Sequence, residues 1–546
     1  MIRNRFFCLL LLLSCCTYIV PAQTRADLLL FNGKIYSVDS GFTMYEAMAV
    51  KDGKIIAMGT TKYLATYPAK EKLDLKNNYV YPGFIDAHCH FYGYGVDLKK
   101  INVTGTKSWE SVLDSLKVHK EQKFMGWIFA RGWDQNDWEI KNYPTKEKLD
   151  SLFPDTPVFI LRIDGHAALV NQMGLNKAGI EISTKVEGGE IEVKNGELTG
   201  LLIDNAVDLV KLKIPNPTRE AEIEALLQAQ KNCFEVGLTT VDDAGLEKET
   251  ILLIDSLQKA GSLKMRYYAM ITYNDANKNY FFKKGKIKTE RLSACAFKIY
   301  ADGALGSRGA LLSKPYSDHE NHIGLYLTPI EKLKEAAIEI AAHDFQLCTH
   351  CIGDSSNRYV LNLYATATKN KTNARWRIEH AQVLNAEDFP LFKQGNIIPS
   401  VQPTHATSDM YWAEDRLGKE RIKNAYAYKK LLAVSGIIAA GSDFPVEDIN
   451  PLYGFYAATV RKDKNNFPKD GFQIENALSR QEALKAMTIW AAYANFEEKE
   501  KGSLEIGKYA DFVILKENLL ELEEEKLWQI KVQSTFVNGE RVFERK

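Results

Sequence analysis

Residues 82–90 read Pro82-Gly83-Phe84-Ile85-Asp86-Ala87-His88-Cys89-His90. The apolar, β-rich residues that lead into the two histidines predict a buried strand over Val80–Ile85. Residues two apart on an extended strand share one face, so His88 and His90 point in the same direction, as two ligands of one metal ion must. A Gly-rich run follows them. The segment therefore predicts a strand that ends in a loop, where barrel enzymes place their chemistry.

Seven more apolar, strand-like runs follow, and helical patterns separate most of them. This alternation predicts βα units and a parallel sheet, and eight strands are the number that closes a (β/α)8 TIM-like barrel. Helices are expected over 218–236 and 329–343, with Thr218 and Thr328 as N-caps. The eight predicted strands are 80–85, 239–242, 266–271, 296–299, 346–349, 375–378, 397–401 and 437–440.

Both ends of the chain have short β-like runs joined by turn signals such as Asn32-Gly33, Asp52-Gly53 and Asn538-Gly539. We expect residues 23–80 and 503–546 to form one composite β-sandwich. Between them, residues 81–99 would be the first barrel strand with its loop, and 226–502 the rest of the barrel. Because the gap between the first two strands is too long for an ordinary connection, residues 100–225 are predicted to be an inserted α+β lid subdomain. A hairpin is expected there at 190–193 and 198–203.

The N-terminal residues 1–22 have the pattern of a secretory signal peptide. Arg3 and Arg5 precede an apolar run over 6–20, and a cleavage site is expected near Ala22. This predicts an exported protein, periplasmic or secreted. A lipoprotein signal anchored at Cys15 is one alternative, and a cytosolic protein with an apolar start is another. No later segment is long and apolar enough to span a membrane.

The charge balance argues against nucleic acid and against an anionic membrane surface as partners, since the chain has 70 Lys and Arg and 70 Asp and Glu. Loss of residues 1–22 would remove two arginines and leave a net charge of about −2. Five cysteines would remain: Cys89, Cys233, Cys295, Cys348 and Cys351. Most lie in apolar runs, which predicts buried free thiols rather than a disulfide framework.

Titratable residues follow several of the predicted strands at their carboxyl ends. Parallel strands bring these ends to the same mouth of a barrel, so the side chains should converge there. Four imidazoles and a carboxylate at one rim suit zinc-like divalent metals. The residues are His88, His90, Lys298, His350, His380 and Asp443.

These motifs resemble the amidohydrolase superfamily, and within it amidohydrolase family 3, which includes N-substituted formamide deformylase-like enzymes. The resemblance covers nearly the whole mature chain. Its matching segments are PGFIDAHCH at 82–90, FKIYADGALGSRGA at 297–310, THCIGD at 349–354, RIEH at 377–380, GSDFPVED at 441–448 and LEIGKYADFV at 504–513.

The resemblance implies a ligand set. His88, His90 and Asp443 would bind one metal, and His350 and His380 a second. Lys298, carbamylated by carbon dioxide, would bridge the two; an unmodified Lys298 favours a one-metal site. The metal would be one or two zinc ions, with iron or manganese as alternatives.

The resemblance also implies the reaction, which is hydrolysis of a non-peptide C–N bond in a small amide or formamide-type molecule by a metal-activated hydroxide. Asp443 would act as base and then as acid. Alternatives are an esterase, lactonase or cyclic-amide hydrolase with the same site, and an inactive secreted metal- or partner-binding protein. Homo-oligomerisation is left open.

The substrate contacts are less strongly indicated. In the insert, His166 is the candidate for a contact with the substrate carbonyl or the leaving group, with a capping or packing role as the alternative. Arg308 and Gln382 are candidates from position alone. Trp133 lies in the segment Arg131-Gly132-Trp133-Asp134, which resembles a segment that overhangs the pocket in this family, and it is a candidate for substrate stacking with a place in the local core as the alternative. Asp86 shares a face with His88 and could either orient a ligand or serve as a structural carboxylate at the strand end.

Overall fold

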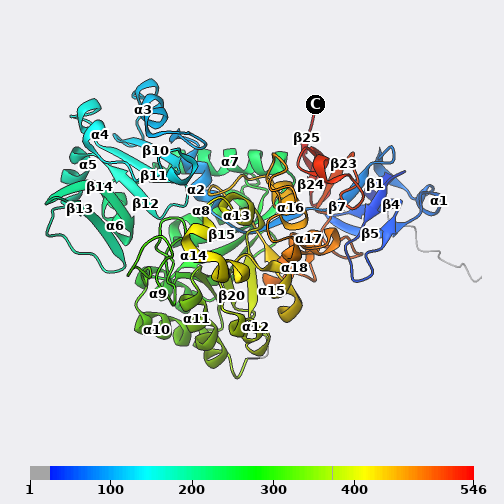
Figure 1. Cartoon of the computed structure of the whole chain (residues 1–546). Coiled ribbons are helices and arrows are strands. Elements are labelled where there is room, and N and C mark those ends of the chain that lie inside the picture. The colour runs from blue at the N-terminus through cyan, green and yellow to red at the C-terminus, as the bar shows by residue number, and fades with distance from the viewer. Residues whose placement is uncertain (1–24, 372) are drawn as a thin grey trace, which may run out of the picture.

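The structure is a computed structural model that describes residues 25–371 and 373–546. Three bodies follow one another across the molecule in Figure 1, with the insert at the left, the barrel in the middle and a β-sandwich at the right. The first and last segments of the described chain, blue and red, lie together in the sandwich. The predicted signal peptide and the alternative anchor at Cys15 lie outside the described residues.

A parallel sheet of eight strands forms the barrel, which confirms the predicted (β/α)8 class. The strands follow the order β8-β15-β16-β18-β19-β20-β21-β22, and the short β17 (Ile287–Lys288) pairs with β18. The two end strands meet through the loop after β22, where the Asp443 N–H donates to the His88 carbonyl at 2.7 Å. The strands are β8 Phe84–Cys89, β15 Leu238–Leu246, β16 Arg266–Thr272, β18 Leu292–Tyr300, β19 Gln346–Cys351, β20 Arg377–His380, β21 Ile398–Val401 and β22 Ala439–Ala440.

The strand predicted at Val80–Ile85 is two strands in the structure. β7 (Tyr79–Pro82) belongs to the sandwich, and β8 begins at Phe84 in the barrel. Gly83 lies between them, where a Cβ would be 2.3 Å from Oγ1 of Thr239. The chain thus crosses from one body to the other at a residue whose lack of a side chain permits close contact with β15.

Two sheets with strands from both ends of the chain form the sandwich. β7 pairs in parallel with β2 and antiparallel with β23, which joins the N-terminal and C-terminal parts in one sheet. Apolar residues from both sheets, such as Leu30, Val50 and Phe512, form a common core. One sheet has the order β5-β4-β1-β6 and the other β25-β24-β23-β7-β2-β3. The strands not yet given are β1 Ala26–Phe31, β2 Lys34–Tyr36, β3 Met44–Tyr45, β4 Ala47–Lys51, β5 Lys54–Gly59, β6 Ala69–Asp74, β23 Phe512–Leu515, β24 Val532–Val537 and β25 Glu540–Glu544.

The insert is a six-stranded sheet with helices, and apolar clusters cover both of its faces. The predicted hairpin is confirmed as β13 and β14. Helix α7 (Arg219–Glu235), capped by Thr218 as predicted, packs against α2, β15 and β24, so it lies with the barrel although the predicted insert ran to residue 225. The elements of the insert are β9 Ile101–Asn102, α3 Trp109–Val118, β10 Ile128–Trp133, α4 Glu147–Leu152, β11 Val158–Arg162, β12 Ala167–Val170, α5 Gln172–Ala178, β13 Gly189–Lys194, β14 Glu197–Asp204 and α6 Asn205–Lys211.

Helices surround the barrel strands (Figure 1). The cap predicted at Thr328 is wrong, because α10 begins after Pro329, which occupies the N-cap position without a side-chain hydrogen bond. The remaining helices of this part are α2 Phe91–Asp97, α8 Lys248–Lys259, α9 Asp275–Lys284, α10 Ile330–Ala342, α11 Asp354–Ala367, α12 Phe389–Gln394, α13 Pro403–Asp409, α14 Ala413–Arg421, α15 Tyr428–Ser435, α16 Pro451–Val460, α17 Arg480–Ala486 and α18 Ile489–Ala494.

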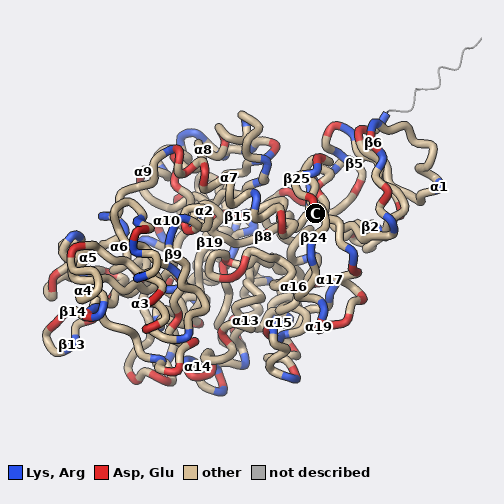
Figure 2. The backbone as a smooth tube through the Cα atoms, turned by 90° about the horizontal axis from the view of Figure 1, so that it is seen from above, with Lys and Arg blue, Asp and Glu red and all other residues tan. Residues whose placement is uncertain are grey.

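The surface and the cysteines agree with the composition. Figure 2 shows basic and acidic residues mixed along the described chain. The five cysteines of the described residues are buried and free, as predicted. Across residues 25–371 and 373–546, we find no helix with the length and apolar character needed to cross a membrane.

Candidate metal centre

Two histidines and one carboxylate meet where the first and last barrel strands join. The Nε2 atoms of His88 and His90 lie 3.5 and 3.2 Å from Oδ1 of Asp443. His90 directs its other ring nitrogen, Nδ1, to the carbonyl of Ala244 at 3.0 Å, and this contact orients the ring. These three residues form one of the two groups in the described chain whose donor atoms lie close enough to share a metal ion. The predicted i,i+2 pair therefore points one nitrogen from each ring to the same place.

The three residues predicted on the middle strands lie at the same rim. Nζ of Lys298 is 3.4 Å from Nε2 of His88. The ring of His380 has its centre 4.9 Å from that of His88 and 4.5 Å from that of His350. All six predicted ligands are thus brought together, and all are buried except His90, which is partly open.

His405 belongs to the rim and is absent from the predicted set. It lies on α13 after β21, with Nε2 3.8 Å from Oδ2 of Asp443, and its ring is stacked at 6.0 Å on that of His380. His380, His405 and Asp443 form the second close group of donors. The residue follows the predicted strand 397–401 by four positions, so the strand-end rule used for the other histidines would have found it.

The backbone at the rim is held in an uncommon conformation. His380 and Asp443 have φ of 74° and 63°, which costs a non-glycine residue of order 1–3 kcal/mol. Asp86 stabilises this geometry, since it accepts hydrogen bonds from Oγ of Ser442 at 2.6 Å and from the His88 N–H at 3.1 Å. A Cβ on Gly441 would lie 2.3 Å from the backbone nitrogen of His88. Asp86 therefore takes the structural role that the sequence left open.

A buried ion pair orients His88. Nδ1 of its ring contacts Oε2 of Glu379 at 2.5 Å, and Arg377 contacts Oε1 of the same carboxylate at 2.8 Å. Burial raises the pKa of Glu379, but the charge of Arg377 and the hydrogen bond with His88 outweigh it and hold the pKa below its usual range. With an ionised Glu379 at Nδ1, the Nε2 of His88 is left free for the rim. Glu379 belongs to the RIEH segment at 377–380, and its contact with His88 gives it an orienting role that the sequence does not reveal.

Burial favours the neutral form of the imidazoles of His88, His350 and His380. It is the main reason that the pKa of His88 falls to about 4, and the charge of Lys298 adds to it. Burial also holds the pKa values of His350 and His380 well below their usual range. Burial also lowers the pKa of Lys298. Neutral imidazoles and a neutral amine are the forms that bind metal ions and carbon dioxide, respectively.

The donor atoms fit a cation. Among the described residues, Nδ1 of His380, Nε2 of His405 and Oδ1 of Asp443 are buried and have no hydrogen-bond partner. Buried polar atoms are nearly always paired, so three orphans at one point require an explanation. Imidazole nitrogens with a carboxylate oxygen are a common donor set for zinc and related ions.

The predicted substrate contacts have different surroundings. His166 reaches the rim, with its ring centre 5.3 Å from that of His350. Trp133 is fully buried in the core of the insert, and its indole N–H donates to Ile160, so it has no surface for a substrate. Both Nε and Nη2 of Arg308 are held by Asp318, and Gln382 donates to the Tyr426 hydroxyl at 3.0 Å.

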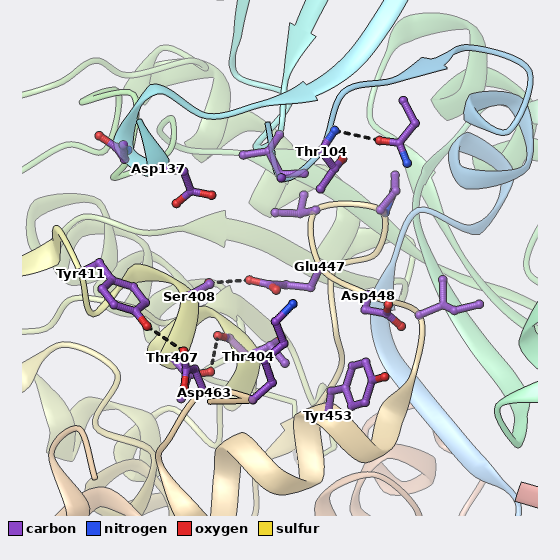
Figure 3. Close-up of a pocket in the computed structure, with 18 of the residues that line it drawn as sticks. Thr104, Asp137, Thr404, Thr407, Ser408, Tyr411, Glu447, Asp448, Tyr453 and Asp463 are labelled. Atoms are coloured by element: carbon purple, nitrogen blue, oxygen red, sulfur yellow. Dashed lines mark hydrogen bonds between the residues drawn. The ribbon is translucent and has the colours of Figure 1, made fainter. Parts of the chain in front are cut away.

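The structure has a cleft of about 1300 Å³. Figure 3 shows some of the residues that line it. Its walls come from the insert, from α13 and from the segment 445–457. Glu447 points into it, accepts a hydrogen bond from Ser408 at 2.6 Å and lies 4.0 Å from Nε2 of His405. None of the six predicted ligands, all of which are described, lines this cleft. Glu447 lines the cleft and His405 does not, so their 4.0 Å contact is where the cleft approaches the rim.

The comparisons with known proteins agree with this geometry. The model of the amidohydrolase family matches residues 71–543. The chain belongs to this family. It is 32% identical to "Putative amidohydrolase YtcJ" of Bacillus subtilis (strain 168), over 94% of this chain and 98% of the relative. It is 25% identical to N-substituted formamide deformylase of Arthrobacter pascens, over 95% and 98% of the two chains.

A solved structure shares the fold over nearly its whole length. An uncharacterized metal-dependent hydrolase from Pyrococcus horikoshii OT3 has a TM-score of 0.75 and 27% identity, and the match covers 91% of this chain and 99% of the other. The amidohydrolase membership predicted from the motifs is confirmed. The chain is a metal-dependent hydrolase that acts on carbon–nitrogen bonds other than peptide bonds.

Proposed function

We propose that this hydrolase cleaves the C–N bond of a small amide or formamide-type substrate at a site built from His88, His90, Lys298, His350, His380 and Asp443. The observation that carries the proposal is the convergence of these side chains at one rim, with unpaired donor atoms on His380 and Asp443. The similarity to a formamide deformylase over nearly the whole chain supports the class of bond. Zinc is the proposed ion, with iron and manganese as alternatives.

The mechanism follows from the arrangement of the residues. A divalent cation held at this rim supplies Lewis acidity, which lowers the pKa of a water molecule and polarises a carbonyl oxygen. Burial raises the pKa of Asp443, but His90 and the neighbouring imidazoles hold it well below its usual value, so the carboxylate is ionised. Asp443 can therefore accept the proton of the attacking water and then donate it to the leaving nitrogen. His166, whose ring centre lies 5.3 Å from that of His350, is the proposed substrate contact.

The chemical state of Lys298 would determine whether the site holds one metal ion or two. Its amine lies 3.4 Å from Nε2 of His88 and is buried, and a buried neutral amine is the form that reacts with carbon dioxide. We propose that Lys298 is carbamylated and that the anion so formed would serve, with His350 and His380, to hold a second ion. The intact mass of the native protein tests this, because carbamylation adds one carbon dioxide; an unmodified Lys298 with one ion per chain would contradict it.

Export is a further proposal, and it rests on the sequence of residues 1–22. The basic start, the apolar run and the small residue at Ala22 support a cleaved signal. Mass spectrometry of the protein from its native cells should find an N-terminus near residue 23. An intact Met1, or a lipid on Cys15, would contradict this proposal.

The reaction itself is tested by metal analysis combined with a substrate panel. Protein purified without chelator should contain about one or two divalent ions per chain and should hydrolyse members of a panel of N-formyl and N-acyl amines. Removal of the metal should abolish turnover, and added zinc should restore it. Turnover of esters or lactones alone would favour the alternative hydrolase, whereas full metal with no turnover on any compound would favour a binding protein.

A further inference from the structure

His166 is fixed by a carboxylate of the insert. It follows β11, and its Nδ1 contacts Oδ1 of Asp204, the last residue of β14, at 2.7 Å. The two residues are also joined through the backbone, since the Asp204 N–H donates to the His166 carbonyl at 2.7 Å. The side chain of Asp204 has no exposed surface, whereas that of His166 is 16% exposed. The open part of this pair is therefore the imidazole.

The barrel is shaped to receive Asp204. A Cβ on Gly303 would lie 2.5 Å from its Oδ1, and a Cβ on Gly309 would lie 2.3 Å from its Oδ2. Both glycines lie in the loop that follows Lys298 and β18. Asp204 itself has φ of 52° and ψ of −127°, an uncommon conformation for a residue with a side chain. Such conformations persist where the surrounding structure determines them, and they cluster at functional sites.

The pair formed by His166 and Asp204 lies at the rim of the barrel, which explains why the structure holds Asp204 in this conformation. The ring of His166 lies 5.3 Å from that of His350 and is tilted by 40° to it. Because Asp204 occupies Nδ1, the ring is held in the tautomer that carries a proton on Nδ1, and its Nε2 edge remains for other contacts. Among the described residues, the bond to Asp204 is the one hydrogen bond of this ring.

We propose that Asp204 is a positioning residue, which holds His166 over His350 so that the Nε2 edge of His166 contacts the substrate. This inference rests on the proposed function, because it needs a substrate at the rim. The insert would then position a substrate contact, because both His166 and Asp204 belong to it. Gly303 and Gly309 of the barrel leave room for the Asp204 carboxylate.

A double-mutant cycle tests the proposal. Asp204→Asn, His166→Asn and the double variant are compared with the wild type by kcat and KM on an N-formyl amine that the wild type hydrolyses. Asp204→Asn should lower kcat/KM at least about tenfold. If Asp204 acts through His166, the double variant should be within about twofold of His166→Asn alone, because coupled residues are not additive. If the losses of kcat/KM in the two single variants multiply in the double variant, the proposal is wrong. Wild-type kcat/KM in Asp204→Asn would also overturn it.

Two further variants separate positioning from folding. Asp208→Asn, four residues later and exposed on α6, is the matched control and should leave kcat/KM and melting temperature unchanged. Gly309→Ala pushes on the Asp204 carboxylate without changing any charge and should reproduce the loss seen with Asp204→Asn. Metal content should stay at the wild-type level in all variants. A Gly309→Ala variant with the kcat/KM of the wild type would count against a positioning role of Asp204.

A crystal structure of the Asp204→Asn variant separates this inference from the proposed function. The His166 ring should turn away from His350 in that variant, and this result needs no turnover. A wild type that hydrolyses no amide would contradict the proposed function. A variant ring that keeps its wild-type position would contradict the role of Asp204, whatever the substrate.

Discussion

Asp443→Asn is expected to lower kcat by about 10²–10⁴, the range that a positioned general acid–base group contributes. The amide of asparagine cannot accept the proton of the attacking water, although it keeps the size of the carboxylate. Because His88 and His90 remain, bound metal should fall less than turnover does. The measurement is kcat on the best amide of the panel, together with the metal content of the same sample.

The control for this variant is Asp470→Asn, since Asp470 is exposed and outside both the rim and the lining of the cleft. It should retain the full kcat. An Asp443→Asn enzyme with more than about a tenth of the wild-type kcat would show that another group transfers the proton, contrary to the expected 10²–10⁴-fold loss.

His88→Ala is expected to lose metal as well as activity. His88 supplies a buried nitrogen, Nε2, that lies 3.5 Å from Oδ1 of Asp443 and 3.4 Å from Nζ of Lys298. Loss of an outer partner of a metal ligand costs about 10–100-fold in metal affinity, so loss of the ligand itself should cost more. The apparent zinc affinity is measured by competition with a chelator, followed by kcat after zinc is added back.

A graded series makes this result specific. Glu379→Gln keeps the ligand but weakens the contact that orients it, so its metal affinity should fall by about 10–100-fold and lie between those of the wild type and His88→Ala. His119→Ala changes an exposed histidine at the end of α3 and should match the wild type. Equal metal affinity in His88→Ala and in the wild type would remove His88 from the ligand set.

The barrel and most of the rim could be predicted from the sequence, because the relevant information is local. Two histidines at i and i+2 on an apolar run define both a strand and the face on which they lie. The same reasoning placed Lys298, His350, His380 and Asp443 at strand ends, and parallel strands bring such ends together. The error at Val80–Ile85 arose because two strands of different sheets follow each other without a turn, separated only by Gly83.

Contacts between distant parts of the chain could not be predicted in this way. Glu379 is important because it meets the ring of His88, which lies 291 residues away in the sequence. Asp204 is important because it meets His166 across the insert sheet. Trp133 is a related case, since the sequence allowed either substrate stacking or a place in the local core, and the fold shows that its side chain fills the core of the insert. His405 differs from these residues, because it follows the seventh predicted strand by four positions and its place at the rim is readable from the sequence.

The central claim is that one barrel rim holds a catalytic metal between the first and last strands. A crystal structure of the metal-loaded protein, with anomalous diffraction at the metal edge, tests it most directly. The account predicts an anomalous peak within coordination distance of His88, His90 and Asp443, and a second peak beside His350 and His380 if Lys298 is carbamylated. Metal-loaded, active protein without a peak at these residues would contradict the account.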